Sequence, residues 1–199
     1  AIFAVPDVQR RLDRRTLADV FTCWAPLDGA TAFEGVRQLA AGHFAVYSRT
    51  GLKIQRYWQL RFDSEGGRDR EPSFEDWAGE LADLLIDAVR IRLRADVPVG
   101  AYLSGGLDST LTSAIVKRNF NNLLRTFSVS FTDGRFDEAP FQAAAVDALK
   151  TDHSQVRCSD QDIGTDFPKV VWHSETPLLR TAPAPLYRLS RLVRESNFK

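Results

Sequence analysis

The segment that most constrains the fold of this chain spans residues 97–116 and reads VPVGAYLSGGLDSTLTSAIV. Residues 99–103 form a short apolar run that is typical of a buried strand. The apolar residues that follow have the spacing of a helix face: Leu107, Leu111, Ala114 and Ile115. The strand therefore passes into a helix through two adjacent glycines, Gly105 and Gly106. This arrangement predicts a binding site for a phosphate chain.

The two glycines and the start of the helix supply the chemistry that such a site needs. Gly105 and Gly106 have no Cβ, so the backbone can adopt positive φ and approach an anion closely. The amides of the first helical turn and the helix dipole add hydrogen-bond donors and a partial positive charge. We also expect the hydroxyls of Ser104, Ser109 and Thr110 to act as donors. The alternative is a glycine-rich turn in which Asp and Ser side chains only cap the helix.

Asp108 is the charged residue of this loop. No lysine follows the glycines, so the loop differs from the GxxxxGK[ST] type of phosphate loop. A carboxylate beside bound phosphates requires a cation between them, and Mg²⁺ prefers such oxygen ligands. The sequence therefore predicts Asp108 as a magnesium ligand.

Composition and charge exclude several classes of protein. Lys and Arg together number 26, as do Asp and Glu, so the formal net charge is zero and we expect no nucleic-acid partner. The chain has no run of about 18 apolar residues and no signal-peptide pattern, so we expect no membrane association and a cytoplasmic location. Cys23 and Cys158 lack metal-site or disulfide spacing, and both are expected to be buried packing residues.

The residues after the loop alternate between strand and helix patterns. We predict strands over 124–131 and 153–158, and helices over 137–149, about 161–173 and 183–196. Asp137 is the expected N-cap of the helix over 137–149. Four residues of that helix are expected to face inward: Phe141, Ala144, Ala145 and Ala148. The order of elements predicts an α/β fold with a parallel, doubly wound sheet covered by helices on both faces.

Before the loop, the sequence predicts one long helix over residues 73–94. Ser73 and Asp76 have the spacing of a capping box at its start. Its expected buried stripe consists of Trp77, Leu81, Leu84, Leu85, Ala88 and Val89.

The first 60 residues predict a smaller unit. A helix over 15–24 is followed by two alternating runs, 43–48 and 52–58, that predict a hairpin. One helix and one hairpin bury little apolar surface, so we expect this α+β segment to be the end of a larger domain. Residues 61–72 are polar and charged and are expected to be an interdomain linker.

The loop SGGLDS at a strand-to-helix turn resembles the pyrophosphate loop of the ATP pyrophosphatases. The wider segment is similar to the glutamine-hydrolysing asparagine synthetase family, which implies a Rossmann-like sheet of the adenine nucleotide alpha hydrolase type for residues 73–199. FEGVRQLAAGHFAVYSRTGLKIQRYW is similar to the tail of that family's glutaminase domain, so residues 1–60 are expected to be a glutaminase remnant. The family's N-terminal cysteine has no counterpart in Ala1-Ile2, and its second ATP-facing motif is missing. We therefore expect an internal fragment that is inactive alone.

The resemblance also implies roles for individual residues. It assigns the ATP phosphates to the loop residues Leu103, Ser104, Gly105, Gly106, Leu107, Asp108 and Ser109, with Asp108 contacting Mg²⁺. It places the adenine against the backbone of Val129, for which a core valine is the alternative. Glu175 and Arg180, in a proline-containing loop, are expected at the catalytic substrate site.

Three further polar residues are candidates for a role at the site. Asp137 and Glu138 match an acid pair of the family, but helix capping explains Asp137 equally well. His153 is expected to be a hydrogen-bonded structural histidine rather than a general base.

The resemblance implies an ATP-dependent ligase. In the whole enzyme, ATP adenylates the side-chain carboxylate of aspartate, and ammonia derived from glutamine then gives asparagine, AMP and pyrophosphate. A homodimer is one candidate assembly. The first alternative is a related ligase with another acceptor, such as a β-lactam-forming or peptide-modifying synthetase. The second is a nucleotide-binding module without catalysis.

Overall fold

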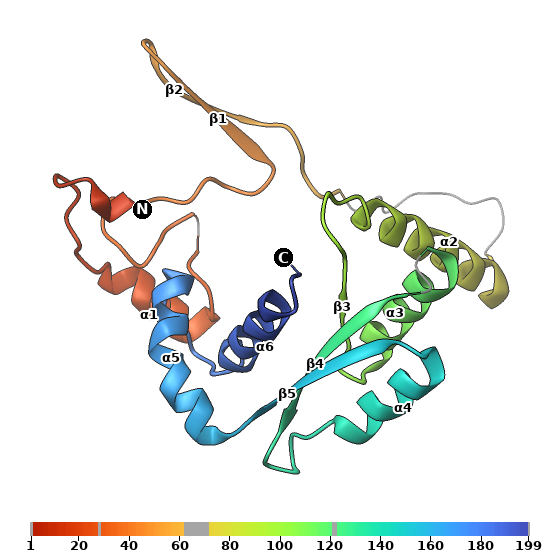
Figure 1. The fold of residues 1–199 in the computed structure, drawn as a ribbon. Helices are drawn as coiled ribbons and strands as arrows, with labels where there is room; N and C mark the ends of the chain where they lie inside the picture. Colours follow the sequence, from red (N-terminus) through yellow and green to blue (C-terminus); the bar gives the residue numbers. More distant parts are fainter. Residues whose placement is uncertain (1, 28, 62–71, 121–122, 199) are drawn as a thin grey trace. The chain divides into compact units, whose positions relative to one another are not determined.

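The structure is a computed structural model that describes residues 2–27, 29–61, 72–120 and 123–198. The chain forms two compact units (Figure 1). The first comprises Ala1–Arg68 with Val171–Leu179, and the second comprises Asp69–Val170 with Arg180–Lys199. Most of the predicted linker, residues 62–71, lies outside the described residues. None of the described helices combines the length and hydropathy that crossing a bilayer requires.

The first unit begins with a short 3₁₀ turn, η1 (Ile2–Ala4), and contains the helix α1 (Arg14–Cys23). Asp13 caps α1 by accepting hydrogen bonds from the backbone N–H groups of Arg15 and Thr16. The strands β1 (His43–Ser48) and β2 (Gly51–Arg56) pair antiparallel, which confirms the predicted hairpin. Cys23 is exposed, so its predicted burial is wrong.

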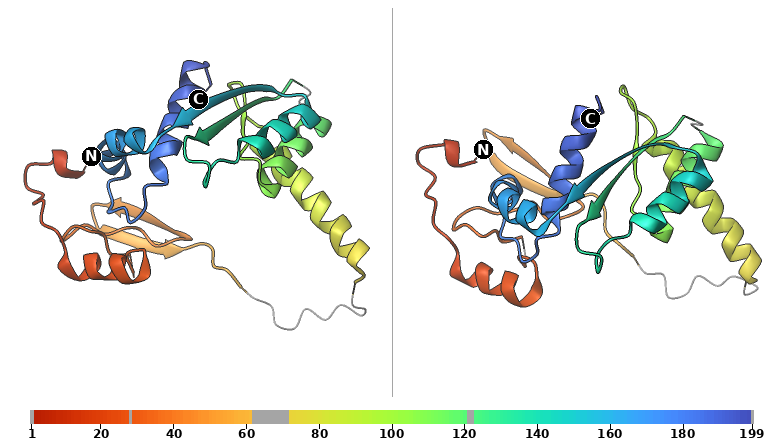
Figure 2. Two further views of the ribbon diagram at one scale, coloured as in Figure 1. Left: turned by 90° about the horizontal axis from the view of Figure 1, so that it is seen from below. Right: turned by 60° about the horizontal axis from the view of Figure 1, so that its bottom comes forward.

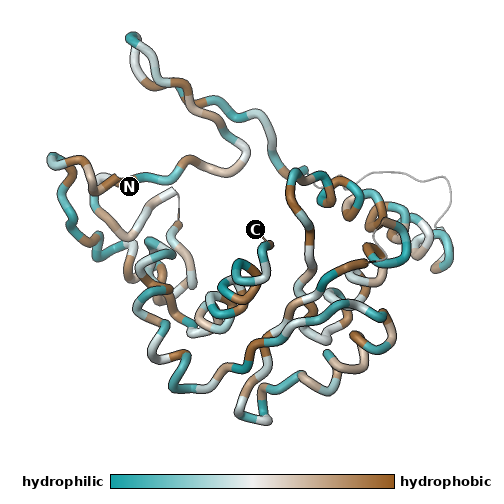
Figure 3. Tube along the Cα trace, viewed as in Figure 1, coloured by the Kyte–Doolittle hydropathy of each residue, from teal (hydrophilic) through white to brown (hydrophobic). Residues whose placement is uncertain are grey.

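The second unit opens with α2 (Phe74–Arg92), which confirms the long predicted helix. Asp76 accepts hydrogen bonds from the backbone N–H and the hydroxyl of Ser73, and these bonds hold the pKa of the Asp76 carboxyl below its ordinary value. Hydrophobic and hydrophilic residues alternate along α2 (Figure 3).

The predicted buried stripe of α2 is largely wrong. Trp77, Leu81 and Leu84 are 48%, 57% and 62% exposed, and Ala88 is also exposed. Val89 near the end of the helix is buried, in a cluster with Val116 and Leu124. The spacing of apolar residues thus identified the helix but not which of its turns have a packing partner in the described chain.

A three-stranded parallel sheet forms the centre of the second unit. It consists of β3 (Ala101–Tyr102), β4 (Arg125–Phe131) and β5 (Asp152–Cys158), in the spatial order β3-β4-β5. The helices α3 (Leu107–Asn119) and α4 (Ala139–Leu149) connect successive strands. The predicted parallel α/β fold is therefore confirmed for these residues, although β3 is much shorter than expected.

Helices cover the two faces of this sheet (Figures 1 and 2). The helix α6 (Pro183–Glu195) packs against β4 and β5 on the face that carries Phe127 and Val129. The opposite face carries the hydroxyls of Thr126 and Ser128 and is covered by α3 and α4. Because β4 is central, residues on both of its faces are buried.

Two details of α3 and α4 differ from the predictions. On α3, Leu107 and Leu111 are exposed, and the helix buries Ser113 and Val116 instead. On α4, Ala145 is buried as expected, whereas three of the residues expected to face inward are exposed: Phe141, Ala144 and Ala148. The N-cap position of α4 is Glu138 rather than Asp137.

His153 lies on the hydroxyl-bearing face, with both ring nitrogens hydrogen-bonded. Its Nδ1 is 2.9 Å from Thr126 Oγ1, and its Nε2 is 3.0 Å from Ser128 Oγ. Burial lowers the pKa of His153 from 6.5, and the charge of Asp152 opposes this effect in part. The contacts are those of a structural histidine, as expected.

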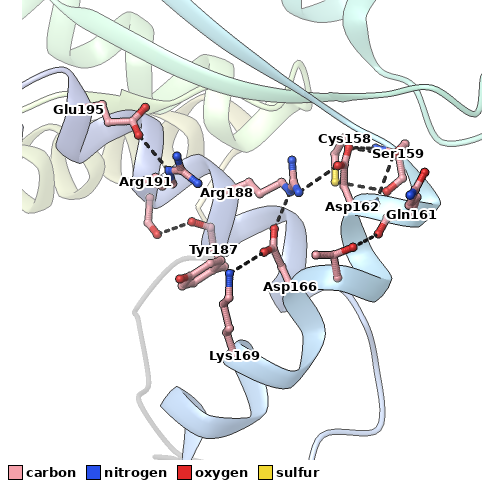
Figure 4. A network of polar contacts seen from close by, with 12 residues as sticks. Cys158, Ser159, Gln161, Asp162, Asp166, Lys169, Tyr187, Arg188, Arg191 and Glu195 are labelled. Atoms are coloured by element: carbon pink, nitrogen blue, oxygen red, sulfur yellow. Dashed lines mark hydrogen bonds and ion pairs between the residues drawn. The ribbon is translucent and has the colours of Figure 1, made fainter.

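An ion-pair network joins α6 to α5 (Asp160–Ser174) (Figure 4). Arg188 Nη2 lies 2.9 Å from Asp162 Oδ1, and Arg188 Nε lies 2.7 Å from Asp166 Oδ2. The angle at Nε does not suit a hydrogen bond, so the second contact is an ion pair. The carboxylate of Asp166 is almost fully buried. The network therefore fixes α6 against the end of the sheet.

We expect Arg188→Leu to lower the free energy of unfolding by about 3 kcal/mol, because it leaves the buried Asp166 carboxylate without this cation. Arg191→Leu on the same helix is the matched control. Among the described carboxylates, Arg191 pairs only with Glu195, and both side chains are exposed. Its replacement should therefore lower the free energy of unfolding by less than about 1 kcal/mol. Urea unfolding of both variants of the full-length protein measures the difference, and equal losses would contradict the structural role of the network.

Stability should also depend on the protonation of His153. Because the folded-state pKa is lowered, the unfolded chain takes up a proton more readily. We expect the free energy of unfolding to fall as the pH drops below 6.5. His153→Gln should flatten this dependence in urea unfolding. An equally steep dependence in that variant would show that another group is responsible.

Candidate functional site

The predicted phosphate loop lies where β3 ends and α3 begins. Leu103 is fully buried, and its backbone N–H donates to the Phe127 carbonyl at 2.9 Å, which extends the sheet by one residue beyond β3. Gly105 has φ of +86°, and a Cβ at this position would lie only 2.8 Å from the backbone N of Gln142. Both the backbone conformation and the close approach of α4 therefore require glycine here.

The loop is braced by its own serines. The hydroxyls of Ser104 and Ser109 lie 2.9 Å apart, and the backbone N–H of Ser104 donates to Ser109 Oγ at 3.2 Å. The backbone N–H of Gly106 donates to Ser104 Oγ, and Ser109 Oγ donates to the Gly106 carbonyl. These contacts hold the shape of the loop. The predicted role of the hydroxyls as donors to phosphate stays a prediction.

The N-terminus of α3 is not capped by a side chain. Gly106 is the N-cap residue, and the first helical hydrogen bond runs from Thr110 N to the Gly106 carbonyl at 3.1 Å. The backbone N–H groups of Leu107, Asp108 and Ser109 therefore belong to the first turn, which lacks intrahelical acceptors. Their donors and the positive end of the helix dipole lie at the loop, an arrangement that favours an anion.

Asp108 is exposed in the first turn of α3. Within the described part of the chain its carboxylate makes no capping hydrogen bond. No group of three or more His, Cys, Asp and Glu side chains among the described residues could hold a metal alone. Mg²⁺ is commonly held by one or two carboxylates together with substrate phosphates, and Asp108 fits that donor set.

A cavity of about 130 Å³ adjoins the loop at the carboxyl ends of β3 and β4. The cavity is lined by residues of the two strands, the phosphate loop and the helices α4 and α6. They are Tyr102, Leu103, Ser104, Phe127, Ser128, Val129, Phe131, Glu138, Gln142, Leu186 and Leu189. The cavity is smaller than the roughly 300 Å³ of a typical small-molecule pocket, so it has room for one part of a nucleotide. Val129 thus lies in the wall of a cavity beside the phosphate loop.

The sequence did not identify Gln142 or Leu186 as part of this site. Gln142 Nε2 donates to the Val129 carbonyl at 3.0 Å and to the Ser104 carbonyl at 3.4 Å. For Gln142, the one signal in the sequence was a polar residue among the alanines of the predicted helix. Leu186 belongs to a predicted helix, but its position over β4 depends on long-range packing.

Asp137 and Glu138, which follow the end of β4, have different surroundings. Asp137 Oδ1 accepts hydrogen bonds from the backbone N–H groups of Phe131 and Ala139 and so joins the strand end to α4. Glu138 lines the cavity. Asp137 is therefore structural, whereas Glu138 is placed near the candidate site.

Glu175 and Arg180 are both exposed. Glu175, with φ of +52°, follows the last residue of α5 and belongs to the first compact unit. Arg180 belongs to the second unit and lies two residues before the N-cap of α6. Their predicted roles at the substrate site remain predictions.

The chain is similar to curated proteins that are named as asparagine synthetases or amidases. The chain is 30% identical to asparagine synthetase (glutamine-hydrolyzing) 3 of Bacillus subtilis, over 98% of this chain and 33% of that protein. It is 39% identical to a putative asparagine synthetase (glutamine-hydrolyzing) 2 of Methanocaldococcus jannaschii, over 82% of this chain and 31% of the relative. It is also 32% identical to the amidase chry2 of Gibberella zeae, over 76% of this chain and 25% of that protein.

The chain thus spans about a quarter to a third of the length of these curated relatives. The family model described as asparagine synthase matches residues 80–199, which contain the whole parallel sheet and the loop. Because this match covers more than half of the chain, the chain belongs to the asparagine synthase family.

Proposed function

We propose that this chain is the ATP-binding part of an amide-forming ligase that activates a carboxylate as its adenylate. The observation that carries the proposal is the loop 104–109, where Gly105 at positive φ leads into a helix N-terminus without a side-chain cap. Backbone donors at such a turn suit the pyrophosphate part of ATP. Membership of the asparagine synthase family supports the same chemistry.

Within this proposal the residues of the loop have distinct roles. The backbone amides of the first turn of α3 bind the phosphate oxygens, and the hydroxyls of Ser104 and Ser109 keep the loop in shape. Asp108 would hold Mg²⁺ when ATP is bound. Bound Mg²⁺ would offset the negative charge of the departing pyrophosphate. The loop's contribution is electrostatic preorganisation rather than proton transfer.

The cavity beside the loop is the proposed position of the adenine ring. Leu103 and Val129 contribute one wall and Leu186 of α6 another, so the ring would lie between the strand ends and a helix. Glu175 and Arg180 are proposed to act on the acceptor side, as the family resemblance implies.

We further propose aspartate as the acceptor, with its side-chain carboxylate attacking the α-phosphorus of ATP and pyrophosphate leaving. Ammonia, released from glutamine elsewhere in the whole protein, then attacks the acyl adenylate to form asparagine and release AMP. The names of the Bacillus subtilis and Methanocaldococcus jannaschii relatives support this choice. Residues 1–60 are proposed as the tail of the glutaminase domain, because the similarity to the first of these relatives extends over 98% of the chain.

A ligase with another carboxylate acceptor is the second candidate. A relative from Gibberella zeae with 32% identity is named an amidase, so similarity at this level does not identify one acceptor. The loop and the adenine cavity would serve either reaction equally well, because neither contacts the acceptor's distinguishing groups.

We expect the full-length protein, given ATP, Mg²⁺, glutamine and aspartate, to release AMP and pyrophosphate in equal amounts with asparagine. Coupled assays for pyrophosphate and chromatography of the amino acids measure these products. Omitting aspartate should abolish pyrophosphate release, and a panel of other carboxylic acids in its place tests the second candidate. Formation of ADP and phosphate would rule out the adenylation mechanism.

The second test concerns the charge of Asp108. We expect Asp108→Asn to reduce pyrophosphate release by about a hundredfold or more, because it removes an anionic oxygen ligand of Mg²⁺. The melting temperature should hardly change, since no described residue is held by this side chain. Asp147→Asn, at an exposed position of α4, is the matched control and should retain turnover. Wild-type turnover and Mg²⁺ dependence in Asp108→Asn would exclude the metal role.

A further inference from the structure

A chain of hydrogen-bonded polar side chains runs along the hydroxyl-bearing face of the sheet to the phosphate loop. Gln142 on α4 is its last member and is only 3% exposed. Its Nε2 donates to the Val129 carbonyl at 3.0 Å, with a longer contact to the Ser104 carbonyl at 3.4 Å. One carboxamide therefore links α4 both to the cavity wall and to the loop.

The orientation of this carboxamide is fixed from the other side. Gln142 Oε1 accepts a hydrogen bond from Gln155 Nε2 at 2.7 Å, and Gln155 Nε2 also contacts Ser128 Oγ at 3.3 Å. Ser128 Oγ in turn bonds His153. Turning the Gln142 amide over would place its NH₂ against that of Gln155 and its oxygen against two carbonyls. Because Gln142 itself is buried, these contacts permit one orientation of its carboxamide.

The contact with Ser104 matters because of the geometry of the peptide bond. The carbonyl of Ser104 and the N–H of Gly105 belong to one planar trans peptide, so they point in opposite directions. Holding the Ser104 carbonyl toward α4 aims the Gly105 N–H away from α4. The backbone of Gln142 also limits the loop directly, because a Cβ at Gly105 would lie 2.8 Å from Gln142 N.

We propose that Gln142 is a positioning residue that sets the direction of the Gly105 amide and the distance between the loop and the Val129 strand. The assignment of the loop's ligand as ATP rests on the proposed function. The positioning of the loop itself rests only on the contacts of Gln142. A glutamine that merely fills space between α4 and the sheet would leave the loop unaffected when replaced by a side chain of the same size.

The test uses Gln142→Met in the full-length protein, since methionine nearly matches the length of glutamine but donates no hydrogen bond. Hydrogen exchange of the 103–110 segment is measured without nucleotide, and KM is measured for ATP and for aspartate. We expect faster exchange in the loop and a rise of about tenfold in KM for ATP, with little change in KM for aspartate. Gln155→Met, which removes only the orienting bond, should give a smaller change in the same direction.

Val116→Ala is the matched control for stability. Val116 is buried in the cluster with Val89 and Leu124, away from the loop, so its truncation should lower the melting temperature without changing loop exchange or KM for ATP. Unchanged loop exchange in Gln142→Met, or the same exchange and KM changes in Val116→Ala, would overturn the positioning role. If the wild-type protein does not use ATP, the proposed function fails, whereas loop exchange still decides the role of Gln142.

Discussion

The hydrogen bonding of β4 to β3 on one side and to β5 on the other is the constraint on which the second unit depends. Because the three strands are parallel, their carboxyl ends lie at the same edge of the sheet, and the connections that leave them must turn there. The phosphate loop follows β3, and the segment that contains Asp137 and Glu138 follows β4. Residues separated by about thirty positions in the sequence thereby become neighbours around one cavity. The place of the candidate site is thus a consequence of strand direction. The loop's glycines let the backbone N–H groups there approach an anion.

The two faces of β4 contribute different properties to that site. Phe127 and Val129 face α6 and give the cavity an apolar wall, whereas Thr126 and Ser128 face α4 and hydrogen-bond to His153. Apolar contacts tolerate small displacements, but a buried hydrogen-bond network loses free energy when any partner is displaced. The polar face therefore fixes the register of α4 on the sheet, and α4 in turn carries Gln142 to the loop.

Local signals in the sequence predicted the elements well, because they act through neighbouring residues. The Ser73–Asp76 capping box, the hairpin of β1 and β2 and the turn at Gly105 each depend on residues a few positions apart. Burial was predicted poorly. Trp77, Phe141 and Leu107 are apolar and lie on the expected helices, yet they are exposed, since burial depends on what packs against a helix face. Pattern and composition do not contain that information. For the same reason the sequence indicated Val129 only through the family resemblance and did not indicate Gln142 or Leu186.

The cavity also depends on an interaction that lies outside it. One wall belongs to the sheet and is fixed by the backbone hydrogen bonds between the strands. The opposite wall belongs to α6, which packs against β4 and β5. The ion pairs of Arg188 with Asp162 and Asp166 hold α6 in place, and Leu186 and Leu189 flank Arg188 in the sequence. A shift of α6 along the sheet would move both leucines relative to Val129. The buried charge of Asp166, costly in isolation, is therefore coupled through α6 to the shape of the proposed adenine site.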